Sequence, residues 1–171
     1  MRATYLYPKK ETISFTLIAR RHIEILRRAG WEVVECEVNN IYNSTILPVT
    51  FIHPIFYPLI TGPRAYRRLF RYTDKLIGFD VADTNRISPL ASYIASQFDL
   101  VIVPTTAVAE IYKNSGVISK IEVLPHGIDE RWLREPREPK HPRIKDVANL
   151  KGKKLLFFLW HSGYRKGADI V

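Results

Sequence analysis

Short apolar runs alternate with segments of helical period along most of this chain, and that alternation restricts the fold more than any other feature. The first apolar run, residues 3–7, is followed by apolar side chains at helical spacing through residues 15–29 and by a second run at residues 31–38. This order predicts a strand, a helix and a strand joined by a right-handed parallel crossover. Thr12 or Ser14 is expected to cap the helix, and Gly30 to end it.

The rest of the chain repeats the pattern. We expect strands at residues 49–53, 75–81, 99–103 and 121–124, and helices at residues 63–72, 89–97 and 105–114. The strand at 99–103 is almost wholly apolar, as in a strand buried on both faces. Residues 39–47 are polar and rich in turn-forming residues. Residues 56–60 form too short a segment, interrupted by a proline, to be assigned as helix or strand. The sequence therefore predicts the α/β class, with a Rossmann-like, doubly wound, mainly parallel sheet flanked by helices.

The charge of the chain is unevenly distributed. Lys and Arg number 26 against 17 Asp and Glu, which gives a net charge of +9. Clusters of this kind fit an anionic membrane surface, a phosphorylated substrate or nucleic acid, and they also fit a solvated, thermophile-like surface. On the predicted helix at 63–72, four arginines share one side and repel one another unless an anion or acidic side chains from elsewhere lie there. The clusters are Arg20, Arg21, Arg27 and Arg28; Arg64, Arg67, Arg68 and Arg71; and Lys151, Lys153, Lys154, Arg165 and Lys166.

The single cysteine, Cys36, excludes a disulfide framework and makes a cytoplasmic chain the default. No stretch approaches the ~18 apolar residues of a membrane span, and residues 1–10 lack the apolar core of a signal peptide. The basic clusters leave a peripheral position at a membrane open.

Ligands of doubly wound sheets bind beyond the carboxyl ends of the strands. Asp80 and Asp83 stand at such an end, where a carboxylate suits a general base or a hydroxyl contact; the alternative is that they cap the following turn. His53 closes the third strand and is either structural or part of a cleft. The same edge also carries Thr84, His126 and Gly127. No His or Cys pair has the spacing of metal ligands, so no metal is expected.

The last loop, residues 160–167, joins a predicted strand at 153–160 to the start of a helix. Backbone N–H groups at a helix N-terminus bind anions, and basic side chains strengthen such a site. The loop would therefore form a diphosphate cradle with Arg165, Lys166 and His161.

Two segments, VIVPTTAVAEIYKNSGVISKIEVLPHGID (residues 101–129) and YRKGAD (residues 164–169), stand on either side of a proline- and charge-rich bridge. In this order they resemble the retaining glycosyltransferases of the GT-B fold, group 1 (family 4), of an archaeal type. The resemblance covers residues 75–171 well and residues 1–74 only in layout. It implies transfer of a sugar from a nucleotide-sugar donor, as co-substrate, to an acceptor hydroxyl between two Rossmann-like domains, without a metal or other cofactor.

The resemblance also implies roles for single residues. Lys166 aligns with the lysine that contacts the donor diphosphate, while residues 160–161 replace the family's Gly-Arg pair. Asp80 stands where family members commonly carry a histidine near the reacting sugar, so Asp80 or Asp83 would serve as the base. His53 fits the HxH-like strand end of the family in part. We therefore expect an acceptor-side cleft made by His53, Thr84, His126 and Gly127.

By the same resemblance, residues 1–134 form an acceptor-side domain, residues 135–150 a linker, and residues 151–171 the opening of a donor-binding domain. The chain would then be the acceptor-side part of a hexosyltransferase and would be inactive alone. Expected partners are a nucleotide-sugar donor, a lipid-linked, glycan or small-molecule acceptor, an anionic membrane surface and a second copy of the chain. The alternative is a stand-alone basic Rossmann-like module that binds anionic membrane or nucleic acid; nucleic acid is the weaker partner, because the aromatic interleaving of nucleic-acid binders is missing.

Overall fold

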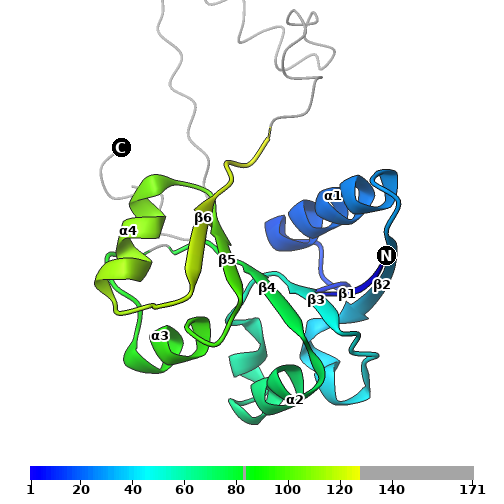
Figure 1. The fold of residues 1–171 in the computed structure, drawn as a ribbon, viewed down its shortest axis with the longest axis horizontal. Coiled ribbons are helices and arrows are strands. Elements are labelled where there is room, and N and C mark those ends of the chain that lie inside the picture. Colours follow the sequence, from blue (N-terminus) through cyan, green and yellow to red (C-terminus); the bar gives the residue numbers. More distant parts are fainter. Residues whose placement is uncertain (83, 128–171) are drawn as a thin grey trace, which may run out of the picture. The chain divides into compact units, whose positions relative to one another are not determined.

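The computed structural model of the protein describes residues 1–82 and 84–127 (Figure 1). The predicted linker and the predicted donor-side segment at 151–171 lie outside the described residues. The elements follow the chain in the order β1 (Arg2–Tyr7), α1 (Ser14–Arg28), β2 (Glu32–Glu37), η1 (Val38–Asn43), β3 (Val49–Ile52), η2 (Tyr57–Ile60), α2 (Arg64–Tyr72), β4 (Lys75–Phe79), α3 (Pro89–Ala95), β5 (Leu100–Val103), α4 (Thr106–Asn114) and β6 (Lys120–Val123).

Within the described residues, six strands form one sheet in the order β2-β1-β3-β4-β5-β6, and every neighbouring pair is parallel. β1 is the pivot of this order, because Thr4 lies opposite Val34 on one side and Thr50 on the other. The chain thus winds first to β2 at one edge and then back through β3 toward β6. This confirms the predicted α/β, Rossmann-like parallel sheet and puts its topological switch point between β1 and β3.

Helices cover both faces of the sheet, with α1 on one side and α2, α3 and α4 on the other (Figure 1). Side chains alternate between the two faces along each strand. Tyr5 and Phe51 therefore share one buried cluster with Ile23 of α1, whereas Leu6 and Ile52 belong to the larger cluster beneath the other helices. Each side chain of this size contributes about 1.5–3 kcal/mol when it is fully buried, so the two clusters fix the layers of the domain.

The start of α1 differs from the prediction. Its N-cap residue is Ile13, and no side chain caps the helix, so the predicted cap by Thr12 or Ser14 is wrong. Thr16 Oγ1 instead donates to the backbone oxygen of Pro8 at 2.8 Å. The first turn of α1 is therefore tied to the loop after β1 rather than closed by a local cap.

Other helix ends follow the sequence. Gly30 ends α1 with a φ of +83°, a conformation that favours glycine. Ser88 Oγ accepts from the Ala91 N–H at 3.2 Å, and Thr105 Oγ1 accepts from the Val108 N–H at 3.2 Å. These side chains start α3 and α4 by satisfying free N–H groups of the first turn. None of the helices in the described ranges is long and apolar enough to cross a bilayer.

The sequence predicted neither a helix nor a strand for residues 39–47 and 56–60. The structure has two short 3-10 helices there: η1, which begins one residue earlier at Val38, and η2. The prediction that β5 is buried on both faces is wrong. Val101 and Val103 are buried beneath the helices, but Leu100 and Ile102 are only half-buried. The reason is that α1, the described helix on that side, packs on β1 and β2 and leaves this part of the sheet uncovered by a described helix.

Candidate functional site

The best-defined polar group at the carboxyl edge of the sheet is His53, which directly follows β3 next to the switch point. Its side chain is buried, with 1% exposure. Nδ1 lies 3.1 Å from the backbone oxygen of Phe79. Because a carbonyl oxygen only accepts, Nδ1 carries the proton and Nε2 carries the lone pair. Nε2 is buried and has no hydrogen-bond partner among the described residues, so it is an acceptor without a donor.

A second histidine, His22, reaches the same place from α1. Its ring lies 5.9 Å from that of His53 and 4.3 Å from that of Phe79, centroid to centroid. Its Nδ1 is 2.7 Å from the hydroxyl of Tyr5. In the sequence, His22 is one residue of the apolar face of the predicted helix at 15–29. Its imidazole among mainly aliphatic side chains was the one sequence signal that could have indicated a site residue.

Both imidazoles are held neutral at pH 7. Burial, which disfavours the imidazolium, lowers the pKa of His22 to about 4, and the nearby His126 adds to that effect. Burial likewise lowers the pKa of His53 to about 4; the hydrogen bond to Phe79 opposes this shift, while His22 and His126 reinforce it. His126 itself is exposed and follows β6. His22 from α1 and His53 after β3 therefore lie side by side, and His126 after β6 is near enough to influence the pKa of both.

Aromatic side chains surround this histidine group. The ring of Phe15 packs edge-on against that of His53 at 5.4 Å and against that of Tyr57 at 6.3 Å. Tyr57 donates its hydroxyl proton to Glu11 Oε2 at 2.6 Å, and this bond to a carboxylate raises the pKa of Tyr57 to about 12. An edge with flat rings, a carboxylate and a free imidazole acceptor has the groups that contact a polyhydroxylated ligand. In the described part of the chain, no three His, Cys, Asp or Glu side chains are arranged to hold a metal ion.

Asp80 lies on the other side of the sheet from His53. Tyr112 of α4 donates its hydroxyl proton to Asp80 Oδ2, and the Asp80 side chain is buried with 6% exposure. Burial and the neighbouring carboxylate together raise the pKa of Tyr112 and of Tyr66 well above the usual range. Asp80 thus interacts with buried tyrosines on the α4 side of the sheet. Its role as a catalytic residue stays a prediction.

The remaining predicted site residues are not brought into the histidine group by a described contact. Thr84 is exposed, and its hydroxyl bonds the backbone of Arg86, accepting from N at 3.4 Å and donating to O at 3.2 Å. Gly127 is exposed beside His126. Asp83, His161, Arg165 and Lys166 lie outside the described residues, and their roles stay predictions.

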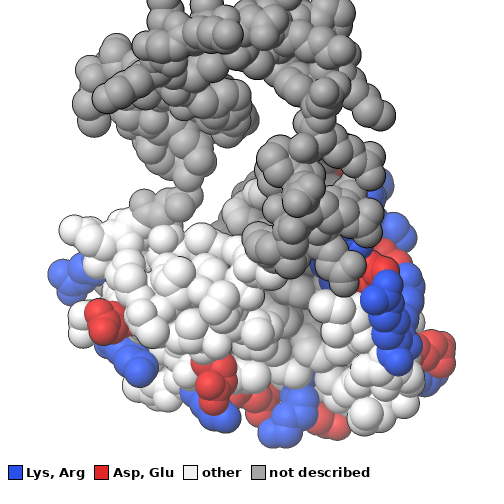
Figure 2. All heavy atoms as spheres, turned by 90° about the horizontal axis from the view of Figure 1, so that it is seen from above, with Lys and Arg blue, Asp and Glu red and all other residues white. Residues whose placement is uncertain are grey.

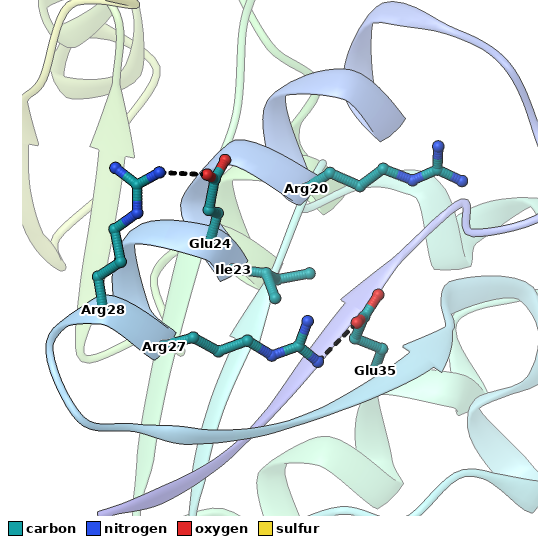
Figure 3. A pocket seen from close by; sticks show the side chains of 6 residues that line it. All are labelled: Arg20, Ile23, Glu24, Arg27, Arg28 and Glu35. Carbon is teal, nitrogen blue, oxygen red and sulfur yellow. Dashed lines mark hydrogen bonds and ion pairs between the residues drawn. The ribbon is translucent and has the colours of Figure 1, made fainter.

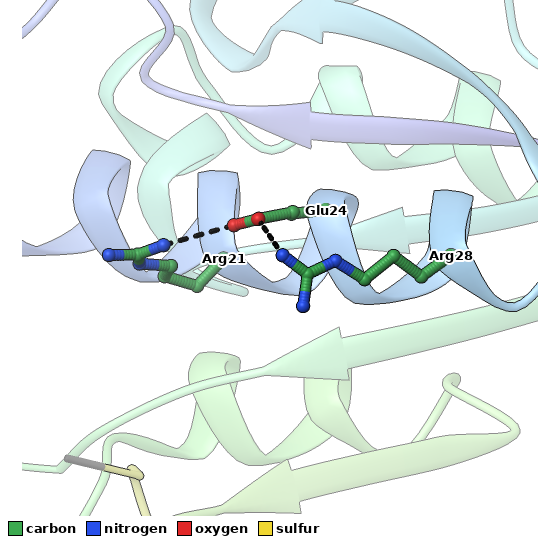
Figure 4. Close-up of polar contacts among 3 residues, drawn as sticks. All are labelled: Arg21, Glu24 and Arg28. Atoms are coloured by element: carbon green, nitrogen blue, oxygen red, sulfur yellow. Dashed lines mark hydrogen bonds and ion pairs between the residues drawn. The ribbon is translucent and has the colours of Figure 1, made fainter. Parts of the chain in front are cut away.

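A shallow pocket of about 590 Å³ lies between α1 and β2 (Figure 3), lined by Arg20, Ile23, Glu24, Arg27, Arg28 and Glu35. Arg27 Nη2 lies 2.7 Å from Glu35 Oε1, and Arg28 Nη2 lies 2.5 Å from Glu24 Oε1. Figure 4 shows Glu24 between Arg28 and Arg21 along α1. The hydrogen bond from Arg21 and the charge of Arg28 lower the pKa of Glu24. Three of the four arginines of this cluster thus form ion pairs, with two carboxylates between them.

The face of the molecule seen in Figure 2 has a broad area without Lys, Arg, Asp or Glu. Charged side chains gather along the margin of that face. Uncharged surface of this kind is compatible with contacts to a further layer or to a ligand.

Comparison with known proteins gives two viral relatives, and no family model matches the chain. The chain is 32% identical over 178 residues to "Uncharacterized protein 356" of Sulfolobus islandicus rod-shaped virus 1, a match that covers 97% of this chain and 50% of the relative. It is 30% identical over 155 residues to "Putative glycosyltransferase 45" of Sulfolobus islandicus filamentous virus (isolate Iceland/Hveragerdi), covering 85% of this chain and 39% of the relative. The chain therefore spans half or less of the length of these relatives.

Proposed function

We propose that the protein takes part in glycosyl transfer, in which a sugar passes from a nucleotide-sugar donor to an acceptor hydroxyl, and that the edge around His53 holds the acceptor. The observation that carries this proposal is the buried Nε2 of His53, which has no hydrogen-bond partner among the described residues and lies at the switch point of a parallel sheet. The similarity to a viral protein named as a glycosyltransferase supports the reaction class.

The reaction needs no redox partner. The bond between the anomeric carbon and the diphosphate oxygen breaks, and a bond between that carbon and the acceptor oxygen forms. The hydroxyl proton leaves to a base or to the departing nucleoside diphosphate. We further propose that the transfer proceeds with retention in a GT-B arrangement, as the resemblance of residues 101–129 and 164–169 implies.

Within this reaction, His53 positions the acceptor rather than taking its proton. A group with a pKa of about 4 is a weak base at neutral pH. Its Nε2 nevertheless keeps a lone pair for a hydroxyl donor, because Nδ1 carries the proton toward the Phe79 oxygen and no described residue donates to Nε2. A sugar or alcohol hydroxyl would satisfy Nε2 and be fixed in direction. For the base we keep Asp80 or Asp83, and for the donor diphosphate Lys166, Arg165 and His161, as proposals.

The test is a transfer assay on the protein translated from its whole reading frame, with UDP-glucose and GDP-mannose as donors and a set of methyl glycosides or water as acceptors. Released nucleoside diphosphate is the readout. His53→Asn is the informative variant, since an asparagine amide can still donate to the Phe79 oxygen but offers no Nε2. We expect about a tenfold loss of kcat/KM for the acceptor, the value of one hydrogen bond, with donor binding unchanged.

Two results would contradict the proposal at different points. Absence of nucleoside diphosphate release from both donors overturns glycosyl transfer. Transfer by His53→Asn at the wild-type rate overturns the acceptor position while leaving the reaction class intact. Circular dichroism of the variant shows whether the fold is kept.

A further inference from the structure

One long stretch of the chain has no acidic residue. Between Glu37 and Asp74, residues 38–73 contain four arginines and neither Asp, Glu nor Lys. This stretch forms η1, β3, η2 and α2, and the four arginines all lie on α2. Because η1, η2 and α2 contact one another, they form a continuous part of the surface. Two carboxylates that contact it, Glu11 and Glu37, bond Tyr57 and the Asn39 N–H rather than an arginine of α2.

The four arginines lie within α2 at the predicted i, i+3, i+4 and i+7 positions, but they differ in burial and in contacts. Arg68 is half-buried; its Nη2 donates to the Ser44 oxygen of the η1 end at 3.3 Å, and its guanidinium lies 5.2 Å from the ring centre of Tyr72. Arg64, Arg67 and Arg71 are exposed, and no ion pair joins them to an acidic side chain of the described residues. This contrasts with α1, where Glu24 and Glu35 pair with the arginines.

The same three elements also expose large side chains with apolar surface. Ile60 at the end of η2 is 71% exposed, Tyr42 of η1 is 51% exposed, and Tyr72 at the end of α2 is 49% exposed. The guanidinium of Arg71 also lies over the ring of Tyr72, at 5.6 Å. We call the six residues Tyr42, Ile60, Arg64, Arg67, Arg71 and Tyr72 the α2 surface.

We propose that the α2 surface docks the protein on an anionic lipid bilayer. Charge complementarity is the first argument: no ion pair joins the three exposed arginines to a carboxylate of the described residues, and anionic headgroups would supply negative charge. The second argument is the apolar component, because an exposed isoleucine gains free energy in the headgroup and acyl boundary, and tyrosine prefers that same interface. A nucleic acid would match the charge and stack on tyrosine, but it would gain little from Ile60.

This docking is independent of the proposed glycosyl transfer, because it uses other residues and needs no donor sugar. Failure of the transfer assay would leave it untouched, and the reverse also holds.

The experiment is flotation of the 171-residue chain with vesicles of phosphatidylcholine and phosphatidylglycerol, against vesicles of phosphatidylcholine alone. We expect binding to the anionic vesicles only, and release at high salt, since the screening length falls to about 3 Å at 1 M salt. The variant Arg64→Gln/Arg67→Gln/Arg71→Gln should lower the partition coefficient about 100-fold, at roughly fivefold for each basic residue near the bilayer. The variant Ile60→Ser should lower it several-fold.

A matched control separates this surface from net charge. Arg86→Gln/Lys113→Gln/Lys120→Gln removes the same three positive charges from exposed positions outside residues 38–73. We expect it to bind vesicles within about twofold of wild type. Equal losses in the two triple variants, equal binding to neutral vesicles, or tight binding of fluorescent single-stranded RNA without vesicle binding would each overturn the proposal.

Discussion

Lowering the pH from 7 to 5 is expected to destabilise the fold through His22 and His53. Both imidazoles have a folded-state pKa of about 4, against 6.5 in the unfolded chain. Between those two values the unfolded state binds more protons than the folded state, so the free energy of unfolding falls as the pH falls. With pKa values of 6.5 and 4, the loss between pH 7 and pH 5 is about 1.8 kcal/mol for each histidine.

The two histidines should contribute unequally. His53 is 1% exposed and should show the full effect, whereas solvent near the half-buried His22 reduces its share. We therefore expect a total loss of about 2–3 kcal/mol. Carboxylates add little in this window. The pKa values of Glu35 and Asp99 are lowered in the fold, so their stabilisation is lost only as the pH falls below their unfolded values of 4.5 and 3.8.

The assay is urea unfolding followed by far-UV circular dichroism at several pH values from 7 to 5. His53→Asn keeps an N–H donor for the Phe79 oxygen and removes the titrating group. Its free energy of unfolding should fall by about 1.8 kcal/mol less than that of wild type over the same range. The reasoning is refuted if the double variant His22→Asn/His53→Asn shows the wild-type pH dependence, because the proton uptake would then come from other groups.

Two further predictions concern the interior on the α4 side. Gly78→Ala should destabilise the fold by about 1–3 kcal/mol, because the added Cβ would overlap Cγ1 and Cδ1 of Ile55 and approach Phe98 Cδ1 at 2.9 Å. Gly127→Ala is the control, since the space around its added Cβ is open. Equal thermal unfolding midpoints of the two variants would contradict this packing argument. Tyr112→Phe should cost about 1–3 kcal/mol, since it leaves the buried Asp80 carboxylate short of a donor, and chemical denaturation of the variant against wild type measures the loss.

Most of the fold could be predicted from the sequence because the signals are periodic. Alternation between apolar runs and helical spacing gave the order of strands and helices, and the rule for parallel crossovers gave the sheet direction. The helix start at Ile13 was missed because Thr12 and Ser14 are both good capping residues in composition, whereas the structure uses Thr16 to bond Pro8. A tertiary contact replaced the local one, and no local pattern reports such a contact.

The candidate site could be predicted only in outline. Strand ends identify which segments meet at the carboxyl edge, and His53 and His126 were found in this way. His22 was not, because a helix residue reaches the edge only through the angle at which α1 packs on the sheet. The pairing of Arg27 with Glu35 likewise depends on how α1 lies over β2.

The register of the strands explains why the side chains of His53 and Asp80 lie on opposite faces of the sheet. Ile52 pairs with Gly78, which sets His53 beside Phe79 on the α1 side and makes Asp80 the first residue after β4. Since side chains alternate with a period of two, that single step turns Asp80 to the opposite face, where Tyr112 holds it. The two residues therefore predict different phenotypes. Loss of Nε2 of His53 should weaken binding of the sugar acceptor while the protein stays stable. A substitution of Asp80 should instead lower the stability of the packing beneath α4.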